Sequence, residues 1–223
     1  MNEVPVIVVN FKAYAEAEGT GSLSAAMICE SISDETGVSI AVCPAMTELG
    51  YVARNINIPV FSQNADPYAP GPSTGWITPS MIKSSGAFGT LLNHSEHRQS
   101  MDQISDTIRL CKTSDLRTLV CAESADMASG IAVYSPDMIA VEPPELIGGD
   151  ISVTDADPKV IANTVESVRS VNARIAVFCG AGVKTGKDVR NALDLGADGV
   201  LLASGVVRSK DQKASLLDLV KYL

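Results

Sequence analysis

The chain has 223 residues, of which 46% are apolar, 19% charged and 4% aromatic. This apolar content argues against disorder, and the lack of any 18-residue apolar run argues against a membrane-spanning segment. With 17 lysines and arginines against 26 aspartates and glutamates, the net charge is −9, which disfavours partners such as nucleic acid or an anionic membrane surface but permits a small anionic substrate.

Short runs of β-branched and other apolar residues recur along the whole chain. They are continuous rather than alternating, as expected of strands buried on both faces of a parallel sheet. The eight runs are Pro5–Val9, Ser39–Cys43, Ile58–Phe61, Phe88–Leu92, Thr118–Cys121, Met138–Val141, Arg174–Phe178 and Gly199–Leu202.

Segments with helical spacing lie between these runs, and each follows a residue that favours a helix start. The alternation continues without a linker, which predicts one α/β domain over residues 1–223. Its architecture is either a closed (β/α)8 barrel or an open doubly wound sheet, and the count of eight strands favours the barrel. The expected helices are Leu23–Ile32 after Ser22, Leu49–Ala53 after Thr47, Ile104–Cys111 after Ser100 or Asp102, Val160–Val168 after Asp157–Pro158, Val189–Leu193 after Thr185, and a last helix from Asp211 to Val220.

One connection, Gln63–Thr78, is long and rich in Pro, Gly and Asn, and it contains the single tryptophan, Trp76. Loops longer than about 12–15 residues in a compact domain are usually functional or interaction loops. We therefore predict a functional or interaction loop here; the alternative is a surface excursion with no role.

Chemically active side chains follow several of the predicted strands. In a barrel the carboxyl ends of the strands meet at one mouth, where catalytic residues gather. A lone lysine is more often a surface charge, and a lone histidine more often structural, so the argument rests on their convergence. The residues are Asn10 and Lys12 after the first run, Asn93–Glu96 after the fourth, and Glu142 after the sixth.

Two turns of small residues, Gly180–Gly182 and Ala203–Gly205, follow the last two strands. The third glycine, Gly186, comes one place too late for a dinucleotide-binding fingerprint. Backbone N–H groups at such turns hold phosphate, and the last two loops of a barrel are its usual phosphate site.

The five cysteines are odd in number and show no C-x-x-C spacing, which indicates reduced, mostly buried thiols in an intracellular protein. The first residues lack a basic segment followed by an apolar stretch, so no secretory signal is predicted. We expect a cytoplasmic protein.

Several motifs together resemble the triosephosphate isomerase family in its short archaeal form. They are Asn10–Lys12, Asn93–Arg98, Val141–Gly148, and Gln63–Asn64 ahead of Thr74–Gly75. The resemblance runs from Val4 to beyond Ser204, and the histidine and glutamate motifs at this spacing are highly specific.

The resemblance implies a TIM barrel that interconverts dihydroxyacetone phosphate and D-glyceraldehyde 3-phosphate through an enediolate, in glycolysis and gluconeogenesis. Glu142 would be the base, and His94 would polarise the carbonyl as a neutral imidazole. Lys12 would hold the phosphate and the enediolate charge, with Asn10 positioning the oxygen and Glu96 fixing the lysine. Neither a cofactor nor a metal is implied.

The resemblance also implies a phosphate site and an assembly. Pro143–Gly148 would form a lid, and the 64–78 loop would insert into a neighbouring subunit, giving a dimer or tetramer. Two turns depart from the family: Cys179–Gly182 stands where a Tyr-Gly-Gly-Ser turn is common, and Ala203-Ser204 where a Gly-Gly pair is common. The phosphate-binding residues would be Asn10, Lys12, Ile147, Gly148, Gly182, Ala203 and Ser204.

Two other functions remain open at this point. One is a different phosphate-binding barrel enzyme, such as an isomerase of aromatic amino-acid synthesis or a Schiff-base aldolase using Lys12. The other is a barrel that only binds sugar phosphates, which would have no need of a base such as Glu142.

Overall fold

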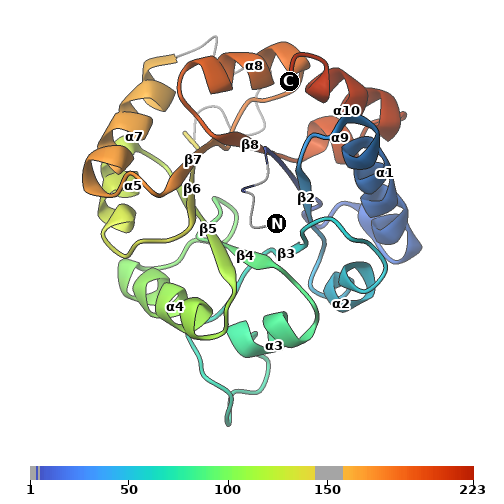
Figure 1. Ribbon diagram of the computed structural model, residues 1–223. Coiled ribbons are helices and arrows are strands. Elements are labelled where there is room, and N and C mark those ends of the chain that lie inside the picture. The colour runs from blue at the N-terminus through green and yellow to red at the C-terminus, as the bar shows by residue number, and fades with distance from the viewer. Residues whose placement is uncertain (1–3, 5, 144–157) are drawn as a thin grey trace.

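The computed structural model describes residues 4, 6–143 and 158–223, and their strands form one parallel sheet surrounded by helices (Figure 1). Neighbouring strands follow the order β2-β1-β8-β7-β6-β5-β4-β3. A bridge between Val42 and Val60 joins the two ends of the sheet, so the predicted barrel is confirmed and the open sheet is wrong. The strands are β1 (Ile7–Asn10), β2 (Ile40–Cys43), β3 (Phe61–Ser62), β4 (Gly89–Leu92), β5 (Arg117–Ala122), β6 (Met138–Val141), β7 (Ala176–Cys179) and β8 (Gly199–Leu202).

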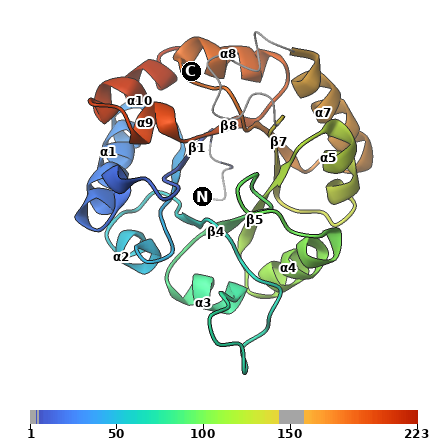
Figure 2. The ribbon, with the colours of Figure 1, turned by 180° about the vertical axis from the view of Figure 1, so that it is seen from behind.

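The helices lie outside the ring of strands, as the view from behind also shows (Figure 2). Two of them begin with a capping box, in which Ser100 pairs with Gln103 and Thr185 with Asp188. The helical segments are the 3-10 turn η1 (Ala15–Ala17), α1 (Thr20–Thr36), α2 (Leu49–Ala53), α3 (Pro79–Ser84), α4 (Met101–Thr113), α5 (Ala125–Ala132), α7 (Pro158–Val171), α8 (Gly186–Asp194), α9 (Ser204–Val207) and α10 (Gln212–Val220).

Both faces of the strands are buried, which explains the continuous apolar runs. In β1, Ile7 and Val9 belong to the apolar cluster shared with the helices, whereas Val8 belongs to a second cluster with Leu119 and Phe178. These three apolar residues of β1 are fully buried, and Asn10, which ends the strand, is 4% exposed. Alternate residues of a strand face the helices and the barrel interior. Because both surroundings are apolar, the residues on both faces of the sheet are apolar, and the run is continuous.

Several predicted boundaries were wrong. Regular pairing of β3 covers Phe61–Ser62 rather than Ile58–Phe61, because Pro59 has no N–H to donate and offers only its carbonyl, which accepts from the Val42 N–H at 3.1 Å. Helix α1 begins after Gly19, and Ser22 lies buried inside it.

Three helices, α3, α5 and α9, and the 3-10 turn η1 were not predicted. Helix α3 begins where the long connection ends, with the Thr78 side chain accepting from the Met81 N–H and Pro79 in the first position. Helix α5 is short and rich in small residues, so the helical spacing of its larger apolar residues is too weak a signal to predict it. Asp157, the predicted start of α7, lies outside the described residues.

All five cysteines are described, and each is buried and unpaired, as predicted. Among the described helices, none is both long and apolar enough to cross a membrane.

Candidate active site

A cavity of about 480 Å³ opens at the carboxyl ends of the strands. Of the ten predicted catalytic and phosphate-binding residues, eight line it, and the other two, Ile147 and Gly148, lie outside the described residues. The eight are Asn10, Lys12, His94, Glu96, Glu142, Gly182, Ala203 and Ser204. Residues separated by more than a hundred positions in the sequence therefore share one mouth, as the strand-end argument requires.

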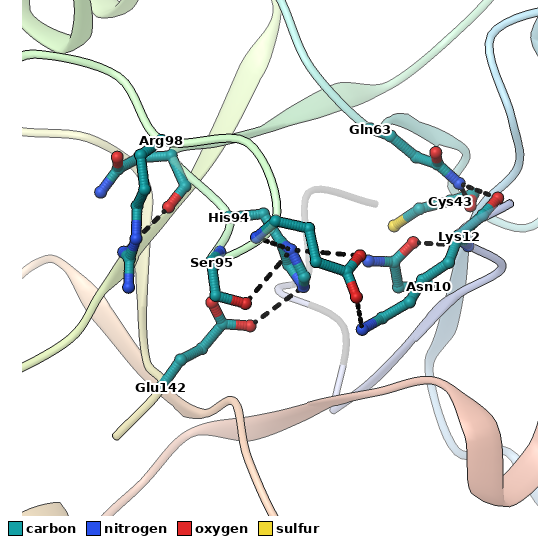
Figure 3. A network of polar contacts seen from close by, with 10 residues as sticks. Asn10, Lys12, Cys43, Gln63, His94, Ser95, Arg98 and Glu142 are labelled. Carbon is teal, nitrogen blue, oxygen red and sulfur yellow. Dashed lines mark hydrogen bonds and ion pairs between the residues drawn. The ribbon is translucent and has the colours of Figure 1, made fainter. Parts of the chain in front are cut away.

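Glu142 follows β6 directly, and only 2% of its surface is exposed. One carboxylate oxygen, Oε2, accepts the Ser95 backbone N–H at 3.2 Å, and Oε1 lies 3.3 Å from His94 Nε2 (Figure 3). Burial raises the pKa of this carboxyl, while the Ser95 amide, the Cys121 thiol and the Lys12 charge oppose the rise. The result is a buried carboxyl with a raised proton affinity, which suits a general base.

His94 is 8% exposed and is held in one tautomer by its neighbour. The Glu96 backbone N–H donates to His94 Nδ1 at 3.2 Å, so Nδ1 accepts and the ring proton resides on Nε2. Burial, followed by the Lys12 charge, lowers the pKa of His94 to about 4, although the Glu96 carboxylate opposes this. A neutral imidazole therefore points its Nε2–H toward the cavity beside Glu142.

Lys12 adopts a left-handed backbone conformation, with φ at 50°. Such a conformation costs a non-glycine residue about 1–3 kcal/mol and persists only where neighbours enforce it. Here the Asn10 side chain accepts the Lys12 N–H at 2.9 Å, and the Gln63 amide donates to the Lys12 carbonyl at 2.9 Å and to the Cys43 carbonyl at 3.0 Å (Figure 3). The turn directs Lys12 Nζ to Glu96 Oε1, at 2.7 Å.

Asn93 shapes the turn that carries His94. It too has a positive φ, of 56°, and its buried side chain joins two segments. Its Nδ2 donates to the Cys121 carbonyl at 2.8 Å, and its Oδ1 accepts the Gln99 N–H at 2.9 Å. The His94 backbone is thereby fixed against the end of β5.

The turns after β7 and β8 also line the cavity. Gly182 has a φ of 69°, which favours glycine, and Ala203 precedes the short helix α9. These turns are predominantly small residues, so a ligand can approach the backbone closely.

Three residues at this site were not predicted from the sequence. Cys121 ends the predicted fifth strand and is fully buried, and its thiol is one of the groups that oppose the rise in the pKa of Glu142. Tyr14 and Lys184 line the cavity, two positions after Lys12 and after Gly182 respectively. Taking every strand end as a candidate position would have found Cys121, since β5 and β6 are neighbours.

The long loop borders a second cavity, of about 390 Å³, which adjoins the same side chains. The loop projects away from the barrel (Figure 1). Asp66 and Ile77 join its two ends: the Asp66 backbone N–H donates to the Ile77 carbonyl at 2.8 Å, and the Asp66 carboxylate accepts the Ile77 N–H at 2.7 Å. The rings of Tyr68 and Trp76 pack against each other at a tilt of 38°, with centroids 4.8 Å apart, and Trp76 is 46% exposed. This second cavity is lined by Asn10, Lys12, Met46, Gln63, Asn64, Asp66, Gly75, Trp76, Ile77, His94, Glu96 and His97.

Over the described residues, no group of histidines, cysteines and carboxylates is arranged to hold a metal ion. The prediction that neither metal nor cofactor is needed remains a prediction.

Comparison with known proteins gives one consistent result. The family model of triosephosphate isomerase matches residues 5–223. The chain is 47% identical over 225 residues to the triosephosphate isomerase of Methanopyrus kandleri, covering all of both chains, and 46% identical over 216 residues to that of Methanothermus fervidus, covering 97% of each. The crystal structure of triosephosphate isomerase from Bartonella henselae has the same fold, with a TM-score of 0.76 at 20% identity over 97% of this chain and 99% of that chain.

Proposed function

The chain belongs to the triosephosphate isomerase family, and we propose that its barrel mouth interconverts dihydroxyacetone phosphate and D-glyceraldehyde 3-phosphate through an enediolate, as a step of glycolysis and gluconeogenesis. Family membership over the full length favours this reaction over the other phosphate-binding barrels. The observation that carries the residue assignment is the contact between Glu142 and a neutral His94, whose nearest atoms are 3.3 Å apart.

Glu142 is the base that removes the proton from the carbon next to the carbonyl. A carbonyl-adjacent proton is far less acidic than a carboxylic acid, so the transfer needs both a raised pKa at the base and donors already placed at the developing oxyanion. Burial supplies the first condition. The Ser95 amide, at 3.2 Å, holds the carboxylate in place between turnovers.

His94 polarises the carbonyl oxygen through its Nε2–H. A neutral imidazole is closer in acidity to an enediol than an imidazolium is, so it can share a proton with the intermediate. The lowered pKa, of about 4, keeps the ring neutral at working pH. A glutamate base beside a neutral histidine is the known pattern of this family, so these two roles follow the family and are supported by the geometry.

Lys12 supplies the positive charge, and Asn10 and Glu96 position it. An ammonium group at the mouth stabilises both the phosphate and the negative charge that forms on the enediolate oxygen. Glu96, 2.7 Å from Lys12 Nζ, holds the lysine extended across the cavity.

The phosphate is held by the small-residue turns of Gly182, Ala203 and Ser204. Their open walls leave backbone N–H groups accessible to an anion, and these turns stand where barrels of this kind bind phosphate. Ile147 and Gly148, which lie outside the described residues, would complete this site as the family pattern implies.

The protein assembles from dimers through the 64–78 loop and acts in the cytoplasm. The exposed pair of Tyr68 and Trp76, whose rings pack against each other on a projecting loop, supports self-association, since aromatic residues are enriched at interface cores. The loop also borders the cavity beside Lys12, so a neighbouring loop docked there would close the site from that side.

The direct test is a coupled assay of triose phosphate turnover. Wild type and a Glu166→Gln control, at an exposed position on α7, should turn over both substrates equally well. Glu142→Gln should bind phosphate-bearing inhibitors as wild type does yet lose turnover. Full activity of Glu142→Gln would remove Glu142 from the base position.

A further inference from the structure

A separate cavity of about 400 Å³ lies at the end of the barrel opposite the mouth. Most of its residues stand at the starts of neighbouring strands β4 to β7 and in the loops that lead into them, Lys112 lies in the last turn of α4, and Val4 precedes β1. They are Val4, Phe88, Lys112, Arg117, Ser135, Pro136, Asp137, Asn172, Arg174 and Ile175. Nothing in the isomerase reaction uses this end of the barrel.

The hydrogen-bond acceptors in this cavity are already occupied. The Asp137 carboxylate accepts from the Arg117 guanidinium and, at 2.9 Å and 3.2 Å, from the N–H and hydroxyl of Thr118. The Asn172 side-chain oxygen accepts the Arg174 backbone N–H at 3.1 Å. The acidic and amide oxygens are therefore committed to holding the loops in place.

The donors, by contrast, are in surplus. Within the described parts of the chain, the Arg174 guanidinium makes no hydrogen bond or ion pair. Lys112 Nζ uses one proton on the Tyr134 carbonyl, at 2.9 Å, and the Ser135 hydroxyl accepts from Asn172 at 3.3 Å and keeps its own proton to donate. A guanidinium, an ammonium and a hydroxyl with unused protons on one cavity form a surface complementary to a ligand with several acceptor oxygens.

The charge balance agrees with this. The cavity carries Lys112, Arg117 and Arg174 against Asp137 alone, an excess of two positive charges in a chain whose net charge is −9. Phe88, Pro136 and Ile175 provide an apolar wall beside these charges. A focused positive cavity on an acidic protein attracts small anions over larger anionic surfaces, which the rest of the molecule repels.

We propose that this cavity, at the amino ends of β4–β7, is a second anion site that binds a small phosphoryl-bearing molecule, with Arg174 and Lys112 as its principal contacts. Arginine and lysine side chains at one cavity match the oxygens of a phosphoryl group, and the volume suits a small metabolite. The site is distinct from the mouth, shares no residue with it, and does not depend on the catalytic roles proposed above.

The test measures binding of pyrophosphate by calorimetry while the mouth is saturated with glycolate 2-phosphate, which has the phosphate and size of a triose phosphate. Wild type should bind one pyrophosphate per chain in addition to the glycolate 2-phosphate at the mouth. The double variant Lys112→Gln with Arg174→Gln should bind it about tenfold more weakly or not at all. Its turnover of triose phosphate should equal that of wild type, which separates failure of this site from failure of the proposed function.

A matched control removes two charges elsewhere, at the exposed Lys187 and Lys210. The double variant Lys187→Gln with Lys210→Gln should bind pyrophosphate as wild type does. Equal loss in both double variants would mean general charge attraction and would overturn the site, as would the absence of a second binding event in wild type. Citrate binding as tightly as pyrophosphate would overturn the assignment of a phosphoryl ligand.

Discussion

Gly180 sets the position of the Glu142 carboxyl, the proposed base, through its lack of a side chain. It follows β7, and a Cβ built on it would lie 2.7 Å from Glu142 Cγ and 3.0 Å from the Val141 carbonyl oxygen. The Val141 carbonyl belongs to β6 and accepts the Gly180 N–H at 2.9 Å, so it is held by the sheet. Because φ of Gly180 lies outside the positive range, alanine can adopt the backbone conformation, and the strain of Gly180→Ala falls on Glu142.

The size of the effect follows from these distances. Ordinary van der Waals contact begins near 3.4 Å, so the Glu142 side chain must move by about 0.7 Å. A misplacement of about 1 Å at a reacting group can cost about 10²-fold in rate. We therefore expect Gly180→Ala to lower kcat by about 10- to 100-fold, with an overpacking cost of about 1–3 kcal/mol in the free energy of unfolding.

The assay is coupled turnover of glyceraldehyde 3-phosphate, with thermal unfolding recorded in parallel to establish that the variant is folded. Gly130→Ala is the matched control, because the nearest atom to its new methyl group is Met101 Cε at 3.7 Å and it lies on a helix far from the mouth. Its kcat should be unchanged. A folded Gly180→Ala variant with kcat within about twofold of wild type would refute the claim that this contact positions the base.

Three further predictions concern the titratable groups of the mouth. Glu142→Gln should lower kcat by about 10²–10⁴-fold. Because burial raises the pKa of Glu142, the contribution of this carboxyl to stability is present below its ordinary pKa near 4.5 and is lost as the pH rises. Denaturant unfolding should therefore find the variant more stable than wild type at pH 7 and equal to it in acid. Lys12→Ala should raise KM and lower kcat together, and a wild-type KM in steady-state kinetics would contradict its contact with the phosphate. The pKa of His94 falls from 6.5 to about 4, so its contribution to stability is lost as pH drops through that interval; His94→Gln should flatten the pH dependence of unfolding there, and an unchanged slope would show that the ring is not held neutral.

The strands and the mouth could be predicted because their signals are local. A strand buried on both faces, such as Ile7–Asn10, must be continuously apolar, and the polar residue that ends it stands at the rim of the barrel. Asn10, His94 and Glu142 were found in this way, and the family resemblance supplied their roles. Their convergence needed only the rule that parallel strands end at one face.

The remaining features depend on contacts between distant segments. The shortness of β3 comes from a proline beside β2, and the approach of Cys121 to Glu142 comes from the pairing of β5 with β6. The second anion cavity joins the end of α4 to the loops before β6 and β7, so no local pattern marks it. In the sequence, Arg174 cannot be distinguished from an ordinary surface charge, because only the folded barrel brings it beside Lys112.

The proton transfer itself offers the most direct measurement of the account. Dihydroxyacetone phosphate is turned over in D2O, the glyceraldehyde 3-phosphate is trapped as it forms, and deuterium at its C2 is measured by proton NMR. A base at Glu142 that exchanges its proton with solvent predicts deuterium at C2 in a substantial fraction of the wild-type product, with both turnover and deuterium incorporation lost together in Glu142→Gln. Full turnover by Glu142→Gln, with deuterium still entering C2, would mean that another group carries the proton, and the proposed role of Glu142 would be wrong.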